Sequence, residues 1–562
     1  MSRTLKIKNS LQLTGSLIVI VLAAYFLNLN FFRIDLTSEK RYTLSDNTLE
    51  LLRKQEKDLY FQIFLAGELP PGFVKLQKSV QEILDEFNVY AEGKIHYELI
   101  NPLEGFKPKE RGQIVSQLVD RGLQPTNLQE KSAEGGLSQK LIFPGVIVHD
   151  QEKETTVNLL KKVNGVSSES NLNHSIESLE YELTMAIRML NATSVKRIAF
   201  LTGHQELNRY EVADFSASLS QHYEVCRIST EQLRSGFDQY KALVIAQPRK
   251  EFSETDKYII DQYVMNGGRV LWLVDEVVAS MDSLSVKEST FAYYQPLNIE
   301  DQLFRYGVRV NPDLVMDAQC ALVPVLSSLP GEPSRYTPGP WYYSPLFVPL
   351  SNHTITRNLN QVKGEFTNSI DTVGRDGRIR KTILLKSSKY TRLEKVPTPV
   401  SLDVVRRPMN AKDFGSGAKS VAVLLEGEFS SVFQNRKPKG IDIEHREESV
   451  PTRMIVVADG DMVRNRVRGT GSNRQIEALG YDRYSRQTYG NRKFLLNCIN
   501  YLCDDEGWMD LRSKEMKLRL LDKTRIRESR LKWQLFNMLL PVAGVLLWGV
   551  FFFMMRKRKY TR

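Results

Sequence analysis

Several residue patterns that carry enzyme chemistry are missing from this sequence of 562 residues. There is no Cys-x-x-Cys pair and no cysteine and histidine cluster at metal-ligand spacing, which excludes a thioredoxin-type redox centre and the common zinc sites. There is no G-x-x-x-x-G-K-[ST] motif, so the chain does not bind ATP through a P-loop. We therefore expect no metal site and no cofactor, and any ATP-driven work needs a separate ATPase.

Cysteine itself is scarce, with Cys226, Cys320, Cys498 and Cys503 as the only examples. The last two are five residues apart on a predicted helix, so their side chains point in different directions. Free buried thiols are therefore favoured over a disulfide, although a disulfide is chemically allowed outside the cytoplasm.

The body of the chain also lacks an excess of positive charge, although the formal net charge is +11. The basic residues are concentrated at the two ends and in residues 511–532, which carry nine basic and three acidic side chains. Residues 33–510 have a net charge of −3. Because this large region is not basic, no nucleic acid or other polyanion is expected as a partner.

Two long uncharged stretches flank that body. Residues 9–32 and 533–555 contain no charged side chain, and at 1.5 Å per helical residue each can cross a hydrocarbon core of about 30 Å. No small-residue cleavage site follows the first stretch, so an uncleaved anchor is favoured over a signal peptide. We predict transmembrane helices at residues 11–32 and 533–555.

The two short tails, residues 1–10 and 556–562, are both basic. The positive-inside rule then places both ends in the cytoplasm and the region between the two spans in the periplasm of a Gram-negative cell. The expected location is the inner membrane, with the phospholipid bilayer as a partner. The basic segment before the second span argues for a cytosolic body instead, and this alternative stays open.

The body predicts two α/β units in succession. Residues 33–190 have the order βαβ, α, ββ, α, which is typical of thioredoxin-like domains, and residues 191–505 alternate strands and helices, which predicts a parallel sheet covered on both faces. The alternation stops after Asp275 and resumes near Arg453, so residues 276–452 are interpreted as an insertion. Residues 506–532 resemble a charged helical stem that continues into the second span.

Polar side chains follow the predicted strands of the second unit. In open α/β sheets, ligands bind at the carboxyl ends of the strands. The candidate binding residues at these ends are His204, Glu206, Asp275 and Asp459. A histidine beside a glutamate has the residue types of a general base and its orienting group.

Catalysis at this loop is nevertheless not the favoured interpretation. Related sheets that hydrolyse amides carry a cysteine or serine on a strand-to-helix elbow, whereas the corresponding turn here has Gln247 and Pro248. A helix N-terminus also favours an acid such as Glu206 for capping alone. We therefore expect a binding cleft and no catalytic residue.

An aromatic run, YTPGPWYYSPLF at residues 336–347, is a second candidate contact surface. Trp341, Tyr342 and Tyr343 are residue types that stack on sugars or bases, so we consider them as a surface for a partner or ligand. Packing within an irregular insertion is the alternative.

Five stretches in this order resemble a known family. They are RIDLTSEKRYTLSDNT, GHQE, YKALVIAQPRKEFSETDKYIIDQYVMNGGRVLWLVDE, WYYSPLFVPLSNHTITRNL and FLLNCINYLCDDEGWMDLRSKEMKLRLLDKTRIR. Together they resemble GldG, the auxiliary component, nominally substrate-binding, of the gliding-motility ABC transporter in Bacteroidetes. The resemblance covers nearly the whole chain and rests on the order and spacing of these pieces.

This resemblance implies a glutamine-amidotransferase-like, flavodoxin-like central domain of the kind found in ABC-associated and intraflagellar-transport proteins. It also implies two partners, a multi-span permease subunit and a separate cytoplasmic ATPase, within a homo- or hetero-oligomer. The expected function is a non-catalytic, membrane-anchored periplasmic subunit of a gliding-motility complex that presents a binding or scaffold ectodomain. Two alternatives stay open: a hydrolase of envelope glycan or amide that uses residues 203–206, and a scaffold that holds an envelope polymer.

Overall fold

The computed structural model divides the chain into two units, residues 1–43 with 515–562, and Leu44–Lys514. The residues that it describes are 11, 13–22, 43–131, 137–161, 167–192, 195–286, 289–326, 335–350, 353–374, 377–406, 409–469, 471–513 and 529–560.

The first module of the larger unit is a four-stranded sheet in the order β2-β1-β5-β6. Strand β1 is parallel to β2 and antiparallel to β5, which is antiparallel to β6. The strands are β1 (Leu59–Ile63), β2 (Ile95–Leu99), β5 (Gly145–His149) and β6 (Glu154–Asn158). The other elements are α2 (Asp46–Arg53), α3 (Pro71–Tyr90), α4 (Pro108–Asp120), the hairpin β3 (Thr126–Lys131) and β4 (Leu137–Ile142), α5 (Ser168–Glu177) and α6 (Leu179–Asn191).

The apolar periodicity of the sequence explains this module. In β1, Leu59, Phe61 and Ile63 are buried while Tyr60 is exposed, as alternation on a pleated strand requires. The stripe on α3 is buried against the same core, with Leu76, Val80, Leu84 and Phe87 as its fully buried members. The predicted order βαβ, α, ββ, α is confirmed, with the hairpin β3–β4 as an additional element.

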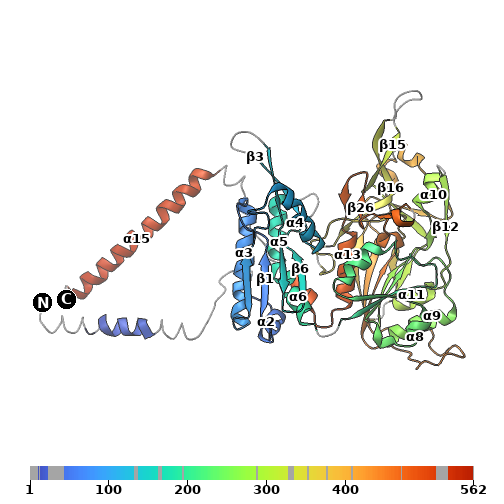
Figure 1. Ribbon diagram of the computed structural model, residues 1–562, viewed down its shortest axis with the longest axis horizontal. Helices are drawn as coiled ribbons and strands as arrows, with labels where there is room; N and C mark the ends of the chain where they lie inside the picture. Colours follow the sequence, from blue (N-terminus) through green and yellow to red (C-terminus); the bar gives the residue numbers. More distant parts are fainter. Residues whose placement is uncertain are drawn as a thin grey trace. The chain divides into compact units, whose positions relative to one another are not determined.

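The second module is built on a twelve-stranded sheet. Its parallel part has the order β23-β10-β9-β7-β8, and Figure 1 shows this module at the right of the view. The strands are β7 (Arg197–Leu201), β8 (Glu224–Ile228), β9 (Ala242–Ala246), β10 (Arg269–Leu273) and β23 (Thr452–Val457). The helices beside them are α7 (Ala213–Ser220), α8 (Thr230–Arg234), α9 (Glu254–Met265) and α13 (Asn491–Leu502).

Helices cover both faces of the parallel part, as predicted. Alternate residues of β7 enter two different cores: Ile198 packs with residues of α7 and α13, whereas Ala199 packs with residues of α9. Strands that are buried on both faces have no polar alternation, which explains apolar runs such as ALVIA in β9.

Residues 276–452 lie between the neighbouring parallel strands β10 and β23, and part of this stretch extends the central sheet. Strand β22 (Ser420–Gly427) runs antiparallel to β23, with Ala422 opposite Val457, and β19, β16 and β15 follow it. The pairing covers an edge of β23 that would otherwise expose unpaired backbone groups. The strands joined to this part are β13 (Val308–Val310), β15 (Cys320–Leu326), β16 (Tyr336–Pro349), β17 (Val362–Lys363), β18 (Ile370–Thr372) and β19 (Ile379–Lys386).

The rest of the stretch forms smaller sheets around a core of its own. These elements are β11 (Val277–Val278), α10 (Met281–Val286), β12 (Ser289–Tyr294), β14 (Asp313–Asp317), β20 (Thr391–Lys395), β21 (Thr398–Ser401) and α12 (Asp403–Arg406). Helix α11 (Glu300–Tyr306) packs instead in the core that contains α9.

The three candidate residues of the aromatic run do not form a surface. The exposed fractions of Trp341, Tyr342 and Tyr343 are only 1%, 6% and 5%. Trp341 contacts Phe366 edge-on, with ring centroids 6.2 Å apart, and all three side chains belong to the small core described above. The expectation of a partner or ligand surface at these residues is therefore corrected: β16 continues the sheet into the smaller core, where these rings pack.

The first residues of the predicted stem form a turn that packs on the first module. Residues Trp508–Ser513 form a short 3-10 turn, η5, in which Trp508 and Met509 are buried. The Tyr181 hydroxyl donates a hydrogen bond to the Met509 sulfur at 3.2 Å, so this turn packs against α6. The remainder of the predicted stem up to residue 528 lies outside the described residues. All four cysteines are free, and Cys498 and Cys503 are buried as predicted.

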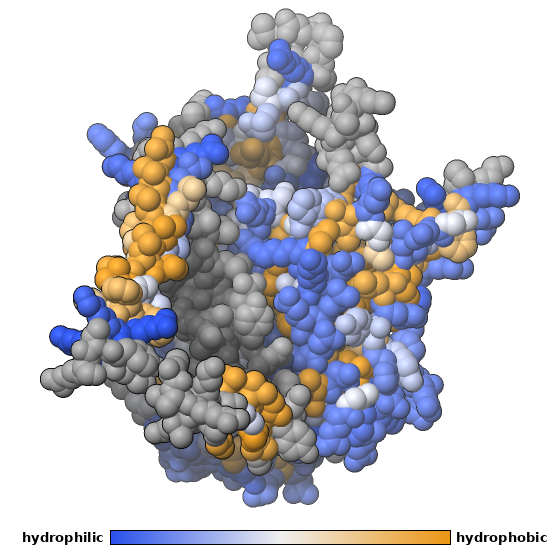
Figure 2. Space-filling model, turned by 90° about the vertical axis from the view of Figure 1, so that its left-hand side faces the viewer, coloured by the Kyte–Doolittle hydropathy of each residue, from blue (hydrophilic) through white to orange (hydrophobic). Residues whose placement is uncertain are grey.

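Helix α15 (Arg530–Tyr560) is the described helix that is long and apolar enough to cross a membrane. Its span Arg530–Arg558 has a mean hydropathy of 2.2, and no part of its most apolar stretch is buried. Figure 2 shows it as a hydrophobic column with hydrophilic ends. For the predicted first span, the described residues include a shorter apolar helix, Leu13–Leu22, and the rest lies outside them. The prediction of two spans is thus supported for one.

Replacement of Trp341 tests the assignment of the aromatic run to the core. We expect Trp341→Ala to lower the free energy of unfolding by about 3–5 kcal/mol, because it removes a large buried ring. Thermal unfolding of the full chain in detergent, followed by circular dichroism, measures this. Tyr336→Ala, on the same strand but 62% exposed, is the matched control and should change little. Equal effects of the two variants would contradict the assignment.

Candidate functional site

The loop that follows β7 holds His204 between two carboxylates. Its Nδ1 lies 3.2 Å from Glu206 Oε1 and its Nε2 lies 3.3 Å from Asp256 Oδ2. Its ring stacks on Phe252 with a centroid distance of 3.8 Å, and the residue is only 5% exposed. His204 and Glu206 therefore contact each other, and Asp256 on α9 supplies a second carboxylate.

Local backbone geometry places these groups. Gly203 has a φ of 132° and Gln205 a φ of 57°, so the chain reverses tightly around the histidine. Glu206 Oε2 accepts the backbone N–H of His204 at 2.8 Å. Asp256 lies in the first turn of α9, where its N–H donates to the N-cap Ser253 at 3.1 Å, as the capping pattern predicts.

The electrostatics favour a charged imidazole. Burial by itself lowers the pKa of His204, but the hydrogen bonds and negative charges of Asp256 and Glu206 outweigh it and raise the pKa to about 9. The hydrogen bond from His204 in turn lowers the pKa of Asp256. At neutral pH both ring nitrogens therefore donate, and the imidazole has no free lone pair to act as a general base.

The other two predicted residues, Asp275 and Asp459, lie at the ends of the adjacent strands β10 and β23. Asp275 accepts the Gln247 side-chain amide at 2.7 Å and the Gly460 backbone N–H at 2.8 Å. Asp459 accepts the backbone N–H of Glu365 at 2.9 Å and the hydroxyl of Thr367. A Cβ at residue 460 would lie 2.7 Å from Asp275 Oδ2, so this close approach requires glycine.

Burial dominates the titration of this acidic group. It raises the pKa of Asp275, and together with the charges of Asp275 and Asp461 it raises that of Asp459 well above its usual value. Asp461 follows two residues later, and burial with the charges of Asp275 and Glu365 raises its pKa to about 7. Among the described residues, no group of three or more histidine, cysteine or acidic side chains is arranged to hold a metal ion.

The elbow after β9 connects the two clusters. Gln247 has a φ of 51°, which is the strained turn geometry of a nucleophile elbow, but its side chain is an amide. That amide donates to Asp275 and accepts from Arg249 at 2.7 Å. The backbone N–H of Arg249 donates to the His204 carbonyl at 2.8 Å. The four predicted residues thus form two neighbouring hydrogen-bonded clusters at the strand ends.

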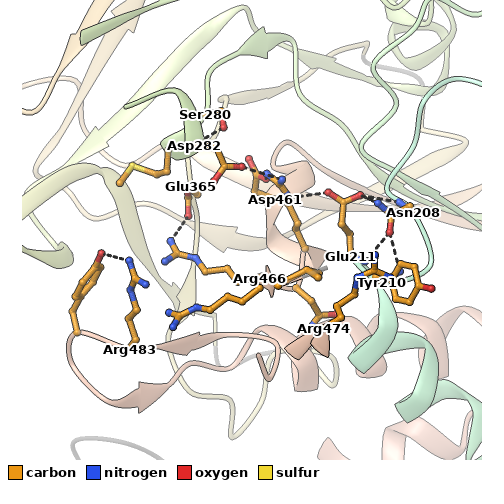
Figure 3. Close-up of a pocket in the computed structure, with 17 residues that line it drawn as sticks. Asn208, Tyr210, Glu211, Ser280, Asp282, Glu365, Asp461, Arg466, Arg474 and Arg483 are labelled. Carbon is orange, nitrogen blue, oxygen red and sulfur yellow. Dashed lines mark hydrogen bonds and ion pairs between the residues drawn. The ribbon is translucent and has the colours of Figure 1, made fainter. Parts of the chain in front are cut away.

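A pocket of about 550 Å³ opens beside Asp461. Sequence analysis did not select its most prominent lining residues, which are five arginines: Arg464, Arg466, Arg468, Arg474 and Arg483. The carboxylates that line it are Glu211, Asp282, Glu365 and Asp461. Figure 3 shows these side chains meeting from separate segments of the chain.

Two short hairpins supply most of the arginines. Arg468 and Arg474 lie in or next to the hairpin β24 (Val467–Arg468) and β25 (Gln475–Ile476), and Arg483 lies between β26 (Tyr481–Asp482) and β27 (Gln487–Thr488). The stretch RNRVR, residues 464–468, has an arginine at every second position and so indicates a local basic cluster. The net charge of residues 33–510, which is negative, does not show this cluster. Alternate residues of an extended segment point to the same side, which places such side chains together.

Comparison with known proteins identifies the family. A family described as an ABC-type uncharacterized transport system, auxiliary component, matches residues 195–498, which is more than half of the chain. The chain belongs to this family. A domain of unknown function matches residues 38–149, within the first module.

Two individual proteins are similar to the chain. An uncharacterized protein of Borreliella burgdorferi is 20% identical over 569 residues, and the match covers 98% of each protein. The solved N-terminal domain of mmIFT52 is 13% identical and matches 55% of this chain and 99% of its own length, at a TM-score of 0.30. That score is too low to support an argument about the fold. The family confirms the general resemblance to auxiliary components, but neither the GldG assignment nor an origin in Bacteroidetes.

Replacement of His204 tests the charged histidine. Its raised pKa adds stability that is fully present below pH 6.5 and is lost as the pH rises through about 9. We expect His204→Gln to destabilise the chain more at pH 6 than at pH 10, by at most about 3 kcal/mol. Thermal unfolding at the two pH values measures the difference. His96→Gln, at a side chain that is 48% exposed, is the control; a pH-independent cost at His204 would contradict the prediction.

Proposed function

We propose that this protein is a non-catalytic, membrane-anchored auxiliary subunit of an ABC-type transport complex. It docks on a permease subunit through its membrane helices, and a separate cytoplasmic ATPase drives the complex. The larger unit, Leu44–Lys514, lies in the periplasm and carries the binding site at the strand ends. Membership in the auxiliary family is the observation that carries this proposal.

The elbow after β9 supports the absence of catalysis. Its strained turn presents Gln247 where related hydrolases present a thiol or hydroxyl, and this amide is already held by Asp275 and Arg249. His204 is buried and paired on both ring nitrogens. Gln247 is therefore not a nucleophile, and His204 has no unpaired ring nitrogen to accept a proton from one. This arrangement is consistent with an amidotransferase-like domain that has no reactive side chain at the elbow. The first module is consistent with a thioredoxin-like domain that has no Cys-x-x-Cys pair.

The flanking segments support attachment to the membrane. Helix α15 carries no charge between Lys532 and Arg556, and basic residues bound it at both ends. Such a helix satisfies its backbone internally and is stable in hydrocarbon. With a first span at residues 11–32 and basic tails on the same side, the larger unit faces the periplasm. Participation in gliding motility is the most specific form of the proposal, and it rests on the sequence resemblance alone.

Purification of the complex tests the proposed partners. The intact chain, tagged after residue 562 and extracted in a mild detergent, should copurify with a multi-span permease and with an ATPase that carries a P-loop. A variant in which the apolar residues 533–555 are replaced by an unrelated transmembrane helix should remain in the membrane fraction and lose the permease. Recovery of the intact chain alone, in a detergent that preserves other transporters, would refute docking.

Protease accessibility tests the orientation. Protease added to intact spheroplasts should cut the larger unit and leave the basic tails protected. A tag before residue 1 and a tag after residue 562 report the tails, and a soluble cytoplasmic protein reports cell integrity. Cleavage of the larger unit only after lysis would place it in the cytoplasm and invert the proposed topology.

A further inference from the structure

The arginines of the pocket beside Asp461 differ in how far they are neutralised. Arg464 contacts three carboxylates: Glu211 at 3.2 Å, Asp282 at 3.2 Å and Asp461 at 3.4 Å. One guanidinium therefore serves three of the four acidic side chains that line the pocket. Because Arg464 contacts these three carboxylates, Glu365 is the one acidic lining residue left beside the other four arginines.

Two of the remaining arginines lie against aromatic rings and away from carboxylates. The guanidinium of Arg474 is 3.7 Å from the ring centroid of Tyr210, and that of Arg483 is 4.7 Å from the ring centroid of Tyr484. Arg483 also donates to the Tyr484 hydroxyl at 2.6 Å. Within the described residues, the salt bridges of the pocket's arginines are made by Arg464, Arg466 and Arg468, and not by these two. Stacking fixes the plane of a guanidinium and leaves other N–H groups on its edge available.

The last two arginines have one acidic neighbour each and remain accessible. Arg466 is 3.7 Å from Glu365, beyond hydrogen-bond distance, and 40% of its side chain is exposed. Arg468 is 2.7 Å from Glu477 and is 50% exposed. In Figure 3 the side chains of Arg466 and Arg483 approach the same part of the pocket from different segments. Several planar donors thus surround one polar cavity.

We propose that this pocket binds a ligand through a phosphate group, with Arg466 and Arg483 as the principal contacts. A phosphate monoester has nearly two negative charges and three acceptor oxygens, so it accepts from more than one guanidinium at a time. A carboxylate has one negative charge and two acceptor oxygens, so it neutralises less of this basic group than a phosphate monoester does. The cavity of about 550 Å³ holds more than a phosphate alone, so the group belongs to a larger molecule such as a sugar phosphate or a lipid headgroup.

The inference does not depend on the complex that the chain joins. The chain has no P-loop motif, so the proposed phosphate contacts are made by arginine side chains instead. The proposal concerns the larger unit alone, so failure to bind phosphate would leave copurification with a permease unaffected, and the reverse also holds.

Binding is tested with the full chain in phosphatidylcholine nanodiscs. Calorimetric titration with inorganic phosphate and with glycerol 3-phosphate should show saturable binding, and acetate should not. The double variant Arg466→Gln/Arg483→Gln should weaken binding about tenfold or more, because charge-assisted bidentate contacts are lost. Arg406→Gln, an arginine on α12 whose side chain is 52% exposed, is the matched control and should bind as the wild type does.

Two further measurements keep the result interpretable. Thermal unfolding shows whether the double variant is folded, and Arg466→Lys/Arg483→Lys, which retains charge without the planar fork, should bind with intermediate affinity. Cosedimentation with phosphatidylcholine vesicles that contain phosphatidic acid tests whether the phosphate belongs to a lipid headgroup. Cosedimentation that depends on Arg466 and Arg483 identifies a lipid ligand. Binding of inorganic phosphate or glycerol 3-phosphate without cosedimentation identifies a soluble ligand. Absence of saturable binding in both arms, or equal binding by a folded double variant, would overturn the proposal.

Discussion

The parallel alignment of β7, β9, β10 and β23 is the constraint on which the rest of the structure depends. Parallel strands all end at the same edge of the sheet, so the loops that follow them must meet there. This geometry brings His204, Gln247, Asp275 and Asp459 into two adjoining clusters, although up to 255 positions separate them in the chain. The same edge carries the arginine pocket. A different strand order would disperse all of these side chains.

The polar side chains at this edge of the sheet form hydrogen bonds with one another. His204 is occupied on both ring nitrogens, and Gln247 donates and accepts within the cluster. Buried polar groups that are satisfied in this way make a site rigid. The accessible chemistry lies instead in the neighbouring arginines, whose side chains remain partly exposed.

Most of the architecture was predictable from local patterns. The alternation in β1, the stripe on α3 and the apolar run of β9 each report burial through a period of 2 or 3.6 residues or through a continuous run. The cap at Ser253 and the missing nucleophile at Gln247 are equally local. Local patterns did not show that part of residues 276–452 extends the central sheet, because pairing between β22 and β23 is a contact between distant strands that no local period encodes.

By itself, the sequence determined the elements, the two α/β modules, the apolar C-terminal helix and the absence of the common catalytic motifs, since each follows from neighbouring residues or from composition. Only the tertiary structure decided that Trp341 packs in a core, that Asp256 is the second partner of His204, and that five arginines line one pocket. The physical reason is that burial and charge pairing depend on side chains from distant segments. The net charge of residues 33–510 is negative. This sum does not show that five positive side chains from separate segments meet at one pocket.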